Sequence, residues 1–176
     1  MSTASPQHSD PPFPRRDVRA ALSTVRWRRE VPNAIRSLGA LADADYADIV
    51  TATTDEPLNG TPEQLVYAAL DRPPRASLVF VAFVQRVFLG FRLKLRPSPD
   101  YLLGWKISDR SDNWMRIETT SWFMTAHVVM HYDEGQISLA AFIRYDRRLA
   151  TLVWPPISLI HRQVALALVR SAIRAQ

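Results

Sequence analysis

The sequence predicts an α+β protein in which antiparallel strands pack against a long C-terminal helix, with two helices between the first strand and the rest. Three observations support this fold class. Apolar and polar residues alternate with a period of two between residues 101 and 145. Apolar residues recur at helical spacing between residues 157 and 173. Thr61-Pro62-Glu63 combines an N-cap residue, an N1 proline and an early acid, which together start a helix.

The composition is that of a single domain. The chain has 176 residues, of which 47% are hydrophobic, and this is enough for one core. It contains no cysteine, which excludes disulfides, thiolate zinc sites and iron–sulfur clusters and fits a reducing compartment. No stretch reaches the ~18 uncharged apolar residues of a membrane span, and the N-terminus lacks the apolar region of a signal peptide. We therefore expect a cytoplasmic protein.

The net charge of +5 is concentrated at the two ends of the chain. Residues 1–30 hold six arginines against three acids, and residues 139–176 hold six arginines against one acid. The segment 31–138 has ten basic and thirteen acidic residues. A nucleic-acid-binding protein needs a continuous basic surface, so this distribution argues against nucleic acid as a partner.

Residues 1–30 are expected to form a flexible basic arm that the fold does not need, and residues 31–176 to form the domain. Residues 1–14 are rich in Pro and Ser and poor in apolar residues, which is typical of disorder. Val18, Leu22 and Val25 lie at roughly helical spacing among arginines. This pattern also permits a short basic helix that binds a membrane surface or a partner, but it is common and unspecific.

The first part of the domain predicts one strand and two helices. Residues 46–54 are rich in β-branched residues and precede a turn, so they predict a strand. Leu65, Val66, Ala69 and Leu70 form the apolar face of the helix that starts near Pro62. Residues 76–91 are apolar nearly all round, and their length favours a buried helix over a strand.

The alternation after residue 101 predicts strands with one inward face. That face carries Tyr101, Leu103, Trp105 and Ile107, then Met115, Ile117, Thr119 and Ser121, and then Met124, Ala126, Val128 and Met130. The sequence Tyr132-Asp-Glu-Gly135 predicts a turn, and pairing Tyr132 with Gly135 would place Met130 opposite Ile137. After Pro155-Pro156, which bends or starts a helix, the last helix has Ile160, Val164, Leu168 and Ala172 along one face.

His127 and His131 lie four residues apart and would be the obvious ligands of a metal ion. Four residues along a strand span about 13 Å, which is too far for both rings to bind one ion. They also share their face with Arg116, Glu118 and other charged residues. A solvated outer surface of the sheet is the preferred interpretation, and we expect no metal and no cofactor.

The inward aromatic, methionine and hydroxyl side chains are the candidate ligand-binding residues. Ordinary core packing explains such a pattern equally well, but adaptable Met beside Tyr and Trp also lines apolar pockets. His161 is added because it lies near the start of the last helix, where it could line the mouth of a cavity. The candidates are Tyr101, Trp105, Met115, Thr119, Ser121, Met124, Met130, Tyr132, Tyr145 and His161.

The element order and three segments resemble the helix-grip fold of START-like, pollen-allergen-like and polyketide cyclase-like proteins, and in particular an uncharacterised bacterial subfamily. The segments are YLLGWKISDRSDNWMRIE, ISLAAFIRYD and PPISLIHRQVALALVRSAIRA. The resemblance covers residues 31–176 and implies a curved antiparallel sheet that grips the last helix around a cavity. The chain departs from the family in showing four clear strands after the helix pair, where six are typical. It also lacks the Gly-rich loop of the allergen branch.

Three functions follow as hypotheses. The first is binding of a small apolar or aromatic molecule in a cavity of roughly a few hundred Å³ between the sheet and the last helix. The second is a cyclase or dehydratase that uses His161 or a tyrosine as acid or base, although we expect no carboxylate on the inward face. The third is contact with an anionic membrane or a partner through the basic arm and the stretch Val87–Arg96. The oligomeric state is not predicted.

Overall fold

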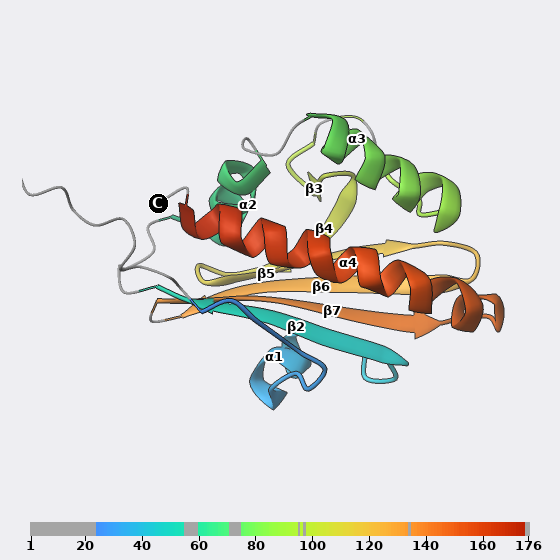
Figure 1. Cartoon of the computed structure of the whole chain (residues 1–176), viewed down its shortest axis with the longest axis horizontal. Helices are drawn as coiled ribbons and strands as arrows, with labels where there is room; N and C mark the ends of the chain where they lie inside the picture. The colour runs from blue at the N-terminus through green and yellow to red at the C-terminus, as the bar shows by residue number, and fades with distance from the viewer. Residues whose placement is uncertain are drawn as a thin grey trace, which may run out of the picture.

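One open antiparallel sheet is the framework of the molecule. The computed structural model describes residues 24–54, 60–70, 75–94, 96, 98–133 and 135–174. Within them, seven strands follow the order β1-β2-β7-β6-β5-β4-β3 (Figure 1). The strands are β1 (Arg26–Arg28), β2 (Tyr46–Thr53), β3 (Tyr101–Leu102), β4 (Trp105–Arg110), β5 (Trp114–Thr120), β6 (Met124–Asp133) and β7 (Gln136–Tyr145).

Helices lie on both faces of this sheet. α4 follows β7 and runs along one face, which we call the inner face, and α1 lies on the opposite, outer face (Figure 1). The helices are α1 (Asn33–Leu38), α2 (Pro62–Leu70), α3 (Arg75–Phe83), the π-helical segment η1 (Val84–Phe88) and α4 (Leu149–Arg174). The α+β fold class is confirmed, including the helices between the strand at 46–53 and the later strands. The arrangement is compatible with a helix-grip fold.

The strands divide their apolar residues between the two faces. Val50 of β2 packs with Ala165 of α4 on the inner face. Its neighbour Ile49 packs on the outer face with Phe142 of β7 and Ile35 of α1. Successive side chains of a strand point to opposite faces, so both layers are built from the same strands. The outer face was predicted to be solvated, and this prediction is wrong where α1 covers it.

The predicted strand beginning at Tyr101 is in fact a hairpin. Leu102 pairs with Trp105, and Leu103 and Gly104 between them have φ values of 53° and 86°. Two consecutive residues with positive φ are typical of a type I′ turn, but leucine seldom adopts this conformation, so the sequence did not reveal it. As a consequence Tyr101 lies opposite Lys106, on the outer side, and its predicted inward orientation is wrong.

The β6–β7 hairpin has the predicted faces but a different register. Met130 pairs with Leu139, and Tyr132 pairs with Ile137, whereas the sequence predicted Met130 opposite Ile137. The shift equals two residues, so it preserves the face of every side chain. Asp133 pairs with Gln136, and Gly135 in the loop between them has a φ of 79°, a conformation that glycine adopts without strain.

The helical segment at 75–88 is formed as predicted, but it is not buried. Val79, Phe80, Phe83, Val87 and Phe88 are between 52% and 67% exposed. Val84 is the member of this segment that reaches the core, at 8% exposure. The prediction of a buried helix is therefore wrong, because no described element covers the far side of α3 and η1.

Part of the predicted arm belongs to the sheet. Residues 1–23 lie outside the described residues, but Arg26, Trp27 and Arg28 pair with Thr51, Val50 and Ile49 of β2. The boundary between arm and domain therefore lies before β1 and not at residue 30.

α4 is a single helix despite Pro155 and Pro156 in its interior. It buries Ala150, Trp154, Ala165 and Val169 against the rest of the fold. Among the described helices it is also the one whose length and apolar content would suffice to cross a membrane. A long helix that packs on a sheet meets the same criteria, so this finding alone does not argue for a membrane span.

Candidate ligand site between the sheet and α4

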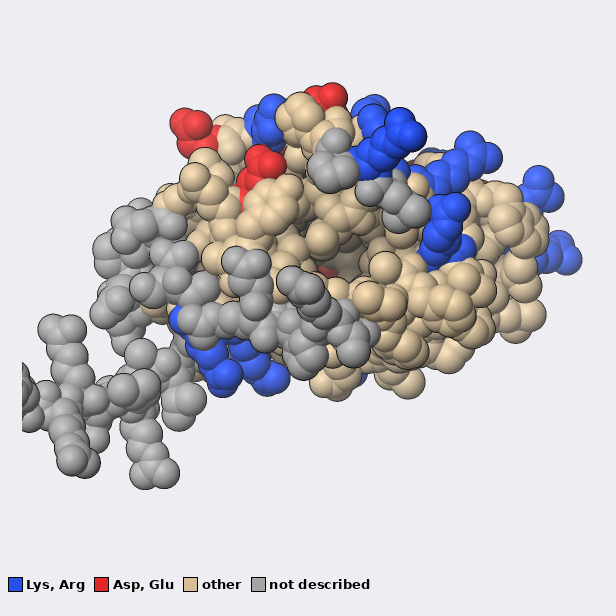
Figure 2. Space-filling model, turned by 90° about the horizontal axis from the view of Figure 1, so that it is seen from above, with Lys and Arg blue, Asp and Glu red and all other residues tan. Residues whose placement is uncertain are grey.

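A cavity of about 160 Å³ lies between the inner face, α2 and α4. Leu65 of α2, Val128 and Met130 of β6, and Val164 and Leu168 of α4 contribute to its walls. The walls are mainly apolar, as expected for a binding site of a small organic molecule. Figure 2 shows a hollow in the face of the molecule to which α3 belongs.

A smaller cavity of about 80 Å³ adjoins the first one toward α3 and η1. Phe80 and Val84 line it on one side, and Trp154 and Ile157 of α4 line it on the other. The two cavities share five lining residues, which are Gln85, Trp105, Val128, His161 and Val164. His161 is the ionisable residue at their junction.

Four of the ten predicted site residues line these cavities. Trp105 and His161 line both, and Met130 and Tyr132 line the larger one. The indole N–H of Trp105 donates to Oε1 of Gln85 at 3.2 Å, which holds η1 against β4. Gln85 was not among the predicted residues, because its polar side chain lies in an apolar segment.

The other six predicted residues lie outside the cavity walls. Met115, Thr119 and Met124 are buried in the sheet core. The Ser121 hydroxyl accepts the backbone N–H of Met124 at 3.2 Å in the β5–β6 turn. The remaining two are Tyr101, whose ring lies under the Lys94 ammonium, and Tyr145, which packs against the core. Alternation identified the inner face, but it could not show which part of that face α4 leaves open.

Asp48, a buried carboxylate on the inner face, was not among the predicted site residues. Its carboxylate accepts hydrogen bonds from the Tyr46 hydroxyl at 2.7 Å and from the Trp27 indole N–H at 3.0 Å. Nε2 of His161 lies 3.3 Å from the other carboxylate oxygen. Asp48 is 2% exposed. The prediction that the inward face holds no carboxylate is therefore wrong.

The surroundings of Asp48 favour its ionised form. Burial raises the pKa of this carboxyl, but the hydrogen bond from His161 and those from Trp27 and Tyr46 outweigh it. The net result is a pKa below the usual value of 3.8. Burial and the hydrogen bond to Asp48 raise the pKa of Tyr46 to about 12, so Tyr46 stays a neutral donor.

Two arginines stack on the partners of Asp48. The Arg162 guanidinium lies 3.7 Å from the centre of the Trp27 ring, and the Arg29 guanidinium lies 4.0 Å from that of Tyr46. Such cation–π contacts fix the rings in place. The group of Trp27, Tyr46, Asp48 and His161 is therefore a rigid polar cluster beside an apolar cavity.

The alternation in β2 is the signal that could have revealed Asp48. Tyr46, Asp48 and Val50 have the same parity, and Tyr46 and Val50 are apolar residues of the inner face. The partners could not be found in the same way, because Trp27 and His161 are 21 and 113 positions away from Asp48.

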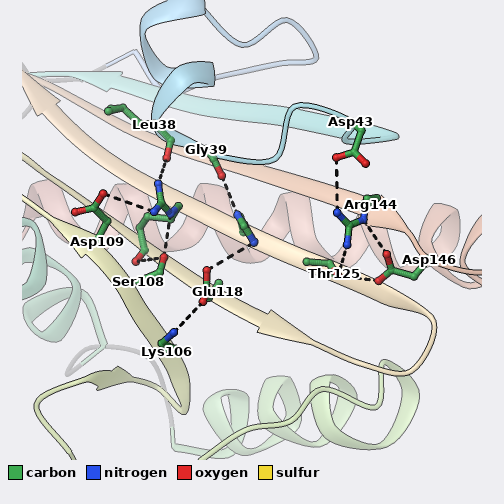
Figure 3. A network of polar contacts seen from close by, with 12 residues as sticks. Leu38, Gly39, Asp43, Lys106, Ser108, Asp109, Glu118, Thr125, Arg144 and Asp146 are labelled. Carbon is green, nitrogen blue, oxygen red and sulfur yellow. Dashed lines mark hydrogen bonds and ion pairs between the residues drawn. The ribbon is translucent and has the colours of Figure 1, made fainter.

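The charged residues of the outer face form a separate network (Figure 3). Two carbonyl oxygens at the C-terminal end of α1 point at the sheet, where Leu38 accepts from Arg116 and Gly39 accepts from Nδ1 of His127, both at 2.8 Å. Nε2 of His127 lies 3.8 Å from Glu118. His127 thus anchors the α1 loop and is not a solvated side chain. In the described part of the chain no group of three or more His, Asp or Glu residues could hold a metal ion.

The inner site is therefore a mainly apolar pair of cavities with His161 at their junction, and His161 contacts the buried carboxylate of Asp48. No family model, no curated protein and no solved structure matches the chain.

Proposed function

We propose that the protein binds a small, mainly apolar molecule in the cavity between the sheet and α4. The observation that carries this proposal is the cavity itself, which interrupts an otherwise closely packed core. An empty apolar space costs stability, and a ligand that fills it recovers the lost contacts. The polar groups that would orient the ligand are Gln85, His131, Tyr132 and His161.

The volume limits the size of the ligand. An engineered apolar cavity of about 150 Å³ holds one benzene molecule. The larger cavity, at about 160 Å³, fits a single aromatic ring, and the adjoining one leaves room for a short substituent. The two adjoining cavities, of about 160 Å³ and about 80 Å³, lie at the lower end of the few hundred Å³ that the sequence suggested. Sterols and fused polyketides are therefore poor candidates.

The resemblance to START-like proteins supports the same function. The helix-grip arrangement places its cavity between the sheet and the last helix, and the cavity described above has this position. Membership in that superfamily remains a proposal, as does the cytoplasmic location.

The test compares two variants of α4. Val164→Phe adds an aromatic ring at a residue that lines both cavities, and Leu159→Phe adds one at an exposed position of the same helix. We expect toluene to raise the melting temperature of the wild type and of Leu159→Phe, and not that of Val164→Phe. Equal responses of all three proteins would contradict binding at this site.

A second function rests on a different observation, the apolar face formed by α3 and η1. Five large apolar side chains of this segment are exposed, which are Val79, Phe80, Phe83, Val87 and Phe88. Trp122 in the neighbouring β5–β6 turn is 59% exposed. A contiguous exposed apolar surface of this kind marks a contact site. We call these six residues the apolar end.

Four arginines lie in or next to the segments that form the apolar end. Arg86 lies within η1, Arg92 follows it, and Arg147 donates to the Trp122 carbonyl at 3.1 Å. With Arg148, these four have no acidic group within ion-pair distance among the described residues. Figure 2 shows basic side chains gathered toward the right of this face. A second copy of the chain would bring like charges together, so we propose an anionic lipid surface as the partner.

Vesicle sedimentation tests the lipid contact. The wild type should sediment with vesicles of phosphatidylcholine and phosphatidylglycerol and less with phosphatidylcholine alone. Phe83→Ser/Phe88→Ser should abolish this binding, whereas Tyr67→Ser, an exposed aromatic outside the apolar end, should retain it. Unchanged binding of the double variant, or dimerisation of the wild type that the double variant loses, would contradict the lipid proposal.

A further inference from the structure

The junction of the two cavities is a place where a ligand would meet a prepared hydrogen-bond acceptor. Asp48 is an ionised carboxylate and can only accept hydrogen bonds. Nε2 of His161, 3.3 Å away, must therefore carry a hydrogen and donate it. In the neutral ring the other nitrogen, Nδ1, is then an acceptor with a free lone pair.

This acceptor is accessible from the cavities. Nδ1 of His161 has no hydrogen-bond partner among the described residues, and it is not one of the buried polar atoms left without one. The ring lines both cavities, and its side chain is 21% exposed. Trp154 packs beside it with ring centres 5.6 Å apart, which restrains its orientation. The His161 ring, and with it Nδ1, is thus restrained by Asp48 and by Trp154.

We propose that His161 accepts the proton of a hydroxyl group on the ligand, so that the site selects phenols among single-ring aromatic molecules. This inference rests on the proposed ligand-binding function and assigns the polar end of the ligand. Asp48 is a positioning residue, because it acts on the ligand through His161. In the transfer, the ligand O–H bond breaks, its electron pair stays on oxygen as a phenolate, and the proton forms a bond to Nδ1.

The charges produced by this transfer are balanced within the site. The imidazolium would face the Asp48 carboxylate at Nε2 and the phenolate at Nδ1. Opposite charges in a poorly solvated site stabilise one another more than they do in water. The other titratable groups nearby are Tyr46, whose hydroxyl donates to Asp48, and His131 and Tyr132, which line the larger cavity. Arg29 and Arg162 stack on Tyr46 and Trp27 and do not line the cavities.

The experiment uses 4-nitrophenol and 4-nitrotoluene, which have similar shapes and differ in a hydroxyl or a methyl group. Binding is measured by titration calorimetry and by the absorption band of the nitrophenol, which shifts when the hydroxyl ionises. The wild type should prefer 4-nitrophenol by about tenfold or more, as a charge-assisted hydrogen bond allows. The bound nitrophenol should show the phenolate band at a pH where the free compound is still protonated.

Three variants separate the contribution of the His161 ring, its ability to accept a proton and the effect of Asp48 on it. His161→Phe keeps a ring of similar size and should bind both compounds equally, without the phenolate band. His161→Gln retains a hydrogen-bond acceptor that cannot take a proton, so it should keep part of the preference and lose the band. Asp48→Asn should turn its amide NH2 toward Nε2, because Trp27 and Tyr46 both donate to the other oxygen, and Nδ1 of His161 would then carry the hydrogen. This variant should therefore lose both the preference for 4-nitrophenol and the band although His161 is intact, which a purely structural role of Asp48 would not do.

The outcomes distinguish this inference from the function on which it rests. Equal binding of both compounds by the wild type, or a phenolate band that persists in His161→Gln, would overturn the proton-acceptor role and leave ligand binding in place. Failure of both compounds to bind the wild type would contradict the cavity function and this inference together. If His161→Phe does not fold, His161→Gln still tests whether proton acceptance by His161 is needed.

Discussion

Asp48 is the residue on which the inner site depends. A buried carboxylate is costly unless every lone pair finds a donor, and here Trp27, Tyr46 and His161 supply three. These donors come from β1, from β2 itself and from α4. One side chain therefore ties the edge of the sheet to the C-terminal helix. The same contacts set the tautomer of His161.

Asp48→Asn should remove a pH dependence of stability. The folded pKa of Asp48 lies below its unfolded value of 3.8, so the ionised form stabilises the protein above that value. This contribution is lost as the pH falls through the folded pKa. Asp48→Asn should cost about 1–3 kcal/mol at neutral pH, and the difference from the wild type should shrink below pH 3.8.

Urea denaturation at several pH values measures this difference. The matched control is Asp112→Asn at an exposed position, which should change the free energy of unfolding by no more than about 0.5 kcal/mol at any pH. A difference between wild type and Asp48→Asn that stays constant down to about pH 2 would show that Asp48 does not titrate in this way.

Gly39→Ala should destabilise the packing of α1 on the outer face. Its φ of −64° suits any residue, but a Cβ there would lie 2.7 Å from the buried ring of Phe142. Overpacking of this kind costs about 1–3 kcal/mol. The double variant Gly39→Ala/Phe142→Leu should lose less than the two single changes together, measured by thermal unfolding in a double-mutant cycle. Strict additivity would show that the ring is not the obstacle.

At the scale of elements, the sequence allowed most strands and helices to be predicted. Alternation located β5, β6 and β7, and helical spacing located α2 and α4, because a half-buried element must repeat with its own period. β3 and β4 were predicted as one strand, since the type I′ turn between them has Leu103-Gly104 in place of the usual Asn-Gly. β1 and α1 are too short to show a period.

Removal of β1 should destabilise the fold, contrary to the expectation that residues 1–30 are dispensable. A chain that starts at Thr24 should be as stable as the full chain in urea denaturation. A chain that starts at Val31 loses the hydrogen bond from Trp27 to Asp48, and this alone should cost about 1.5–3 kcal/mol. Trp27→Phe in the full chain keeps an aromatic ring but not the N–H donor, so it should show part of this decrease in the free energy of unfolding. Equal stability of the two truncated chains would mean that β1 contributes nothing.

At the scale of the whole molecule, the sequence located the candidate site only in outline. It indicated the correct layer, and Trp105, Met130, Tyr132 and His161 from the predicted set line the cavities. It could not indicate Asp48 or Gln85, because their roles arise from contacts between distant segments. In the stretch Val87–Arg96, Val87 and Phe88 are exposed but Leu89, Phe91 and Leu93 are buried, because exposure depends on what the other elements leave uncovered.

A ligand that fills the cavity should stabilise the whole fold by mass action. At a hundredfold excess over its dissociation constant the gain is about 2.7 kcal/mol. For a chain of this size it should raise the melting temperature by roughly 5–10 °C. Scanning calorimetry with increasing toluene measures this shift, and benzyl alcohol serves as a more polar comparison. A melting temperature independent of toluene concentration would contradict an accessible cavity.

The two edges of the sheet differ from its interior in length. The edge strands β1 and β3 have three and two residues, whereas β2, next to β1, has eight. Unpaired strand edges recruit other chains, and a short edge offers few free backbone groups for this purpose. Loss of β1 would leave the β-branched segment Tyr46–Thr53 as the new edge, a much better template for self-association. The short strand at the N-terminal side of the domain therefore also protects the molecule against aggregation.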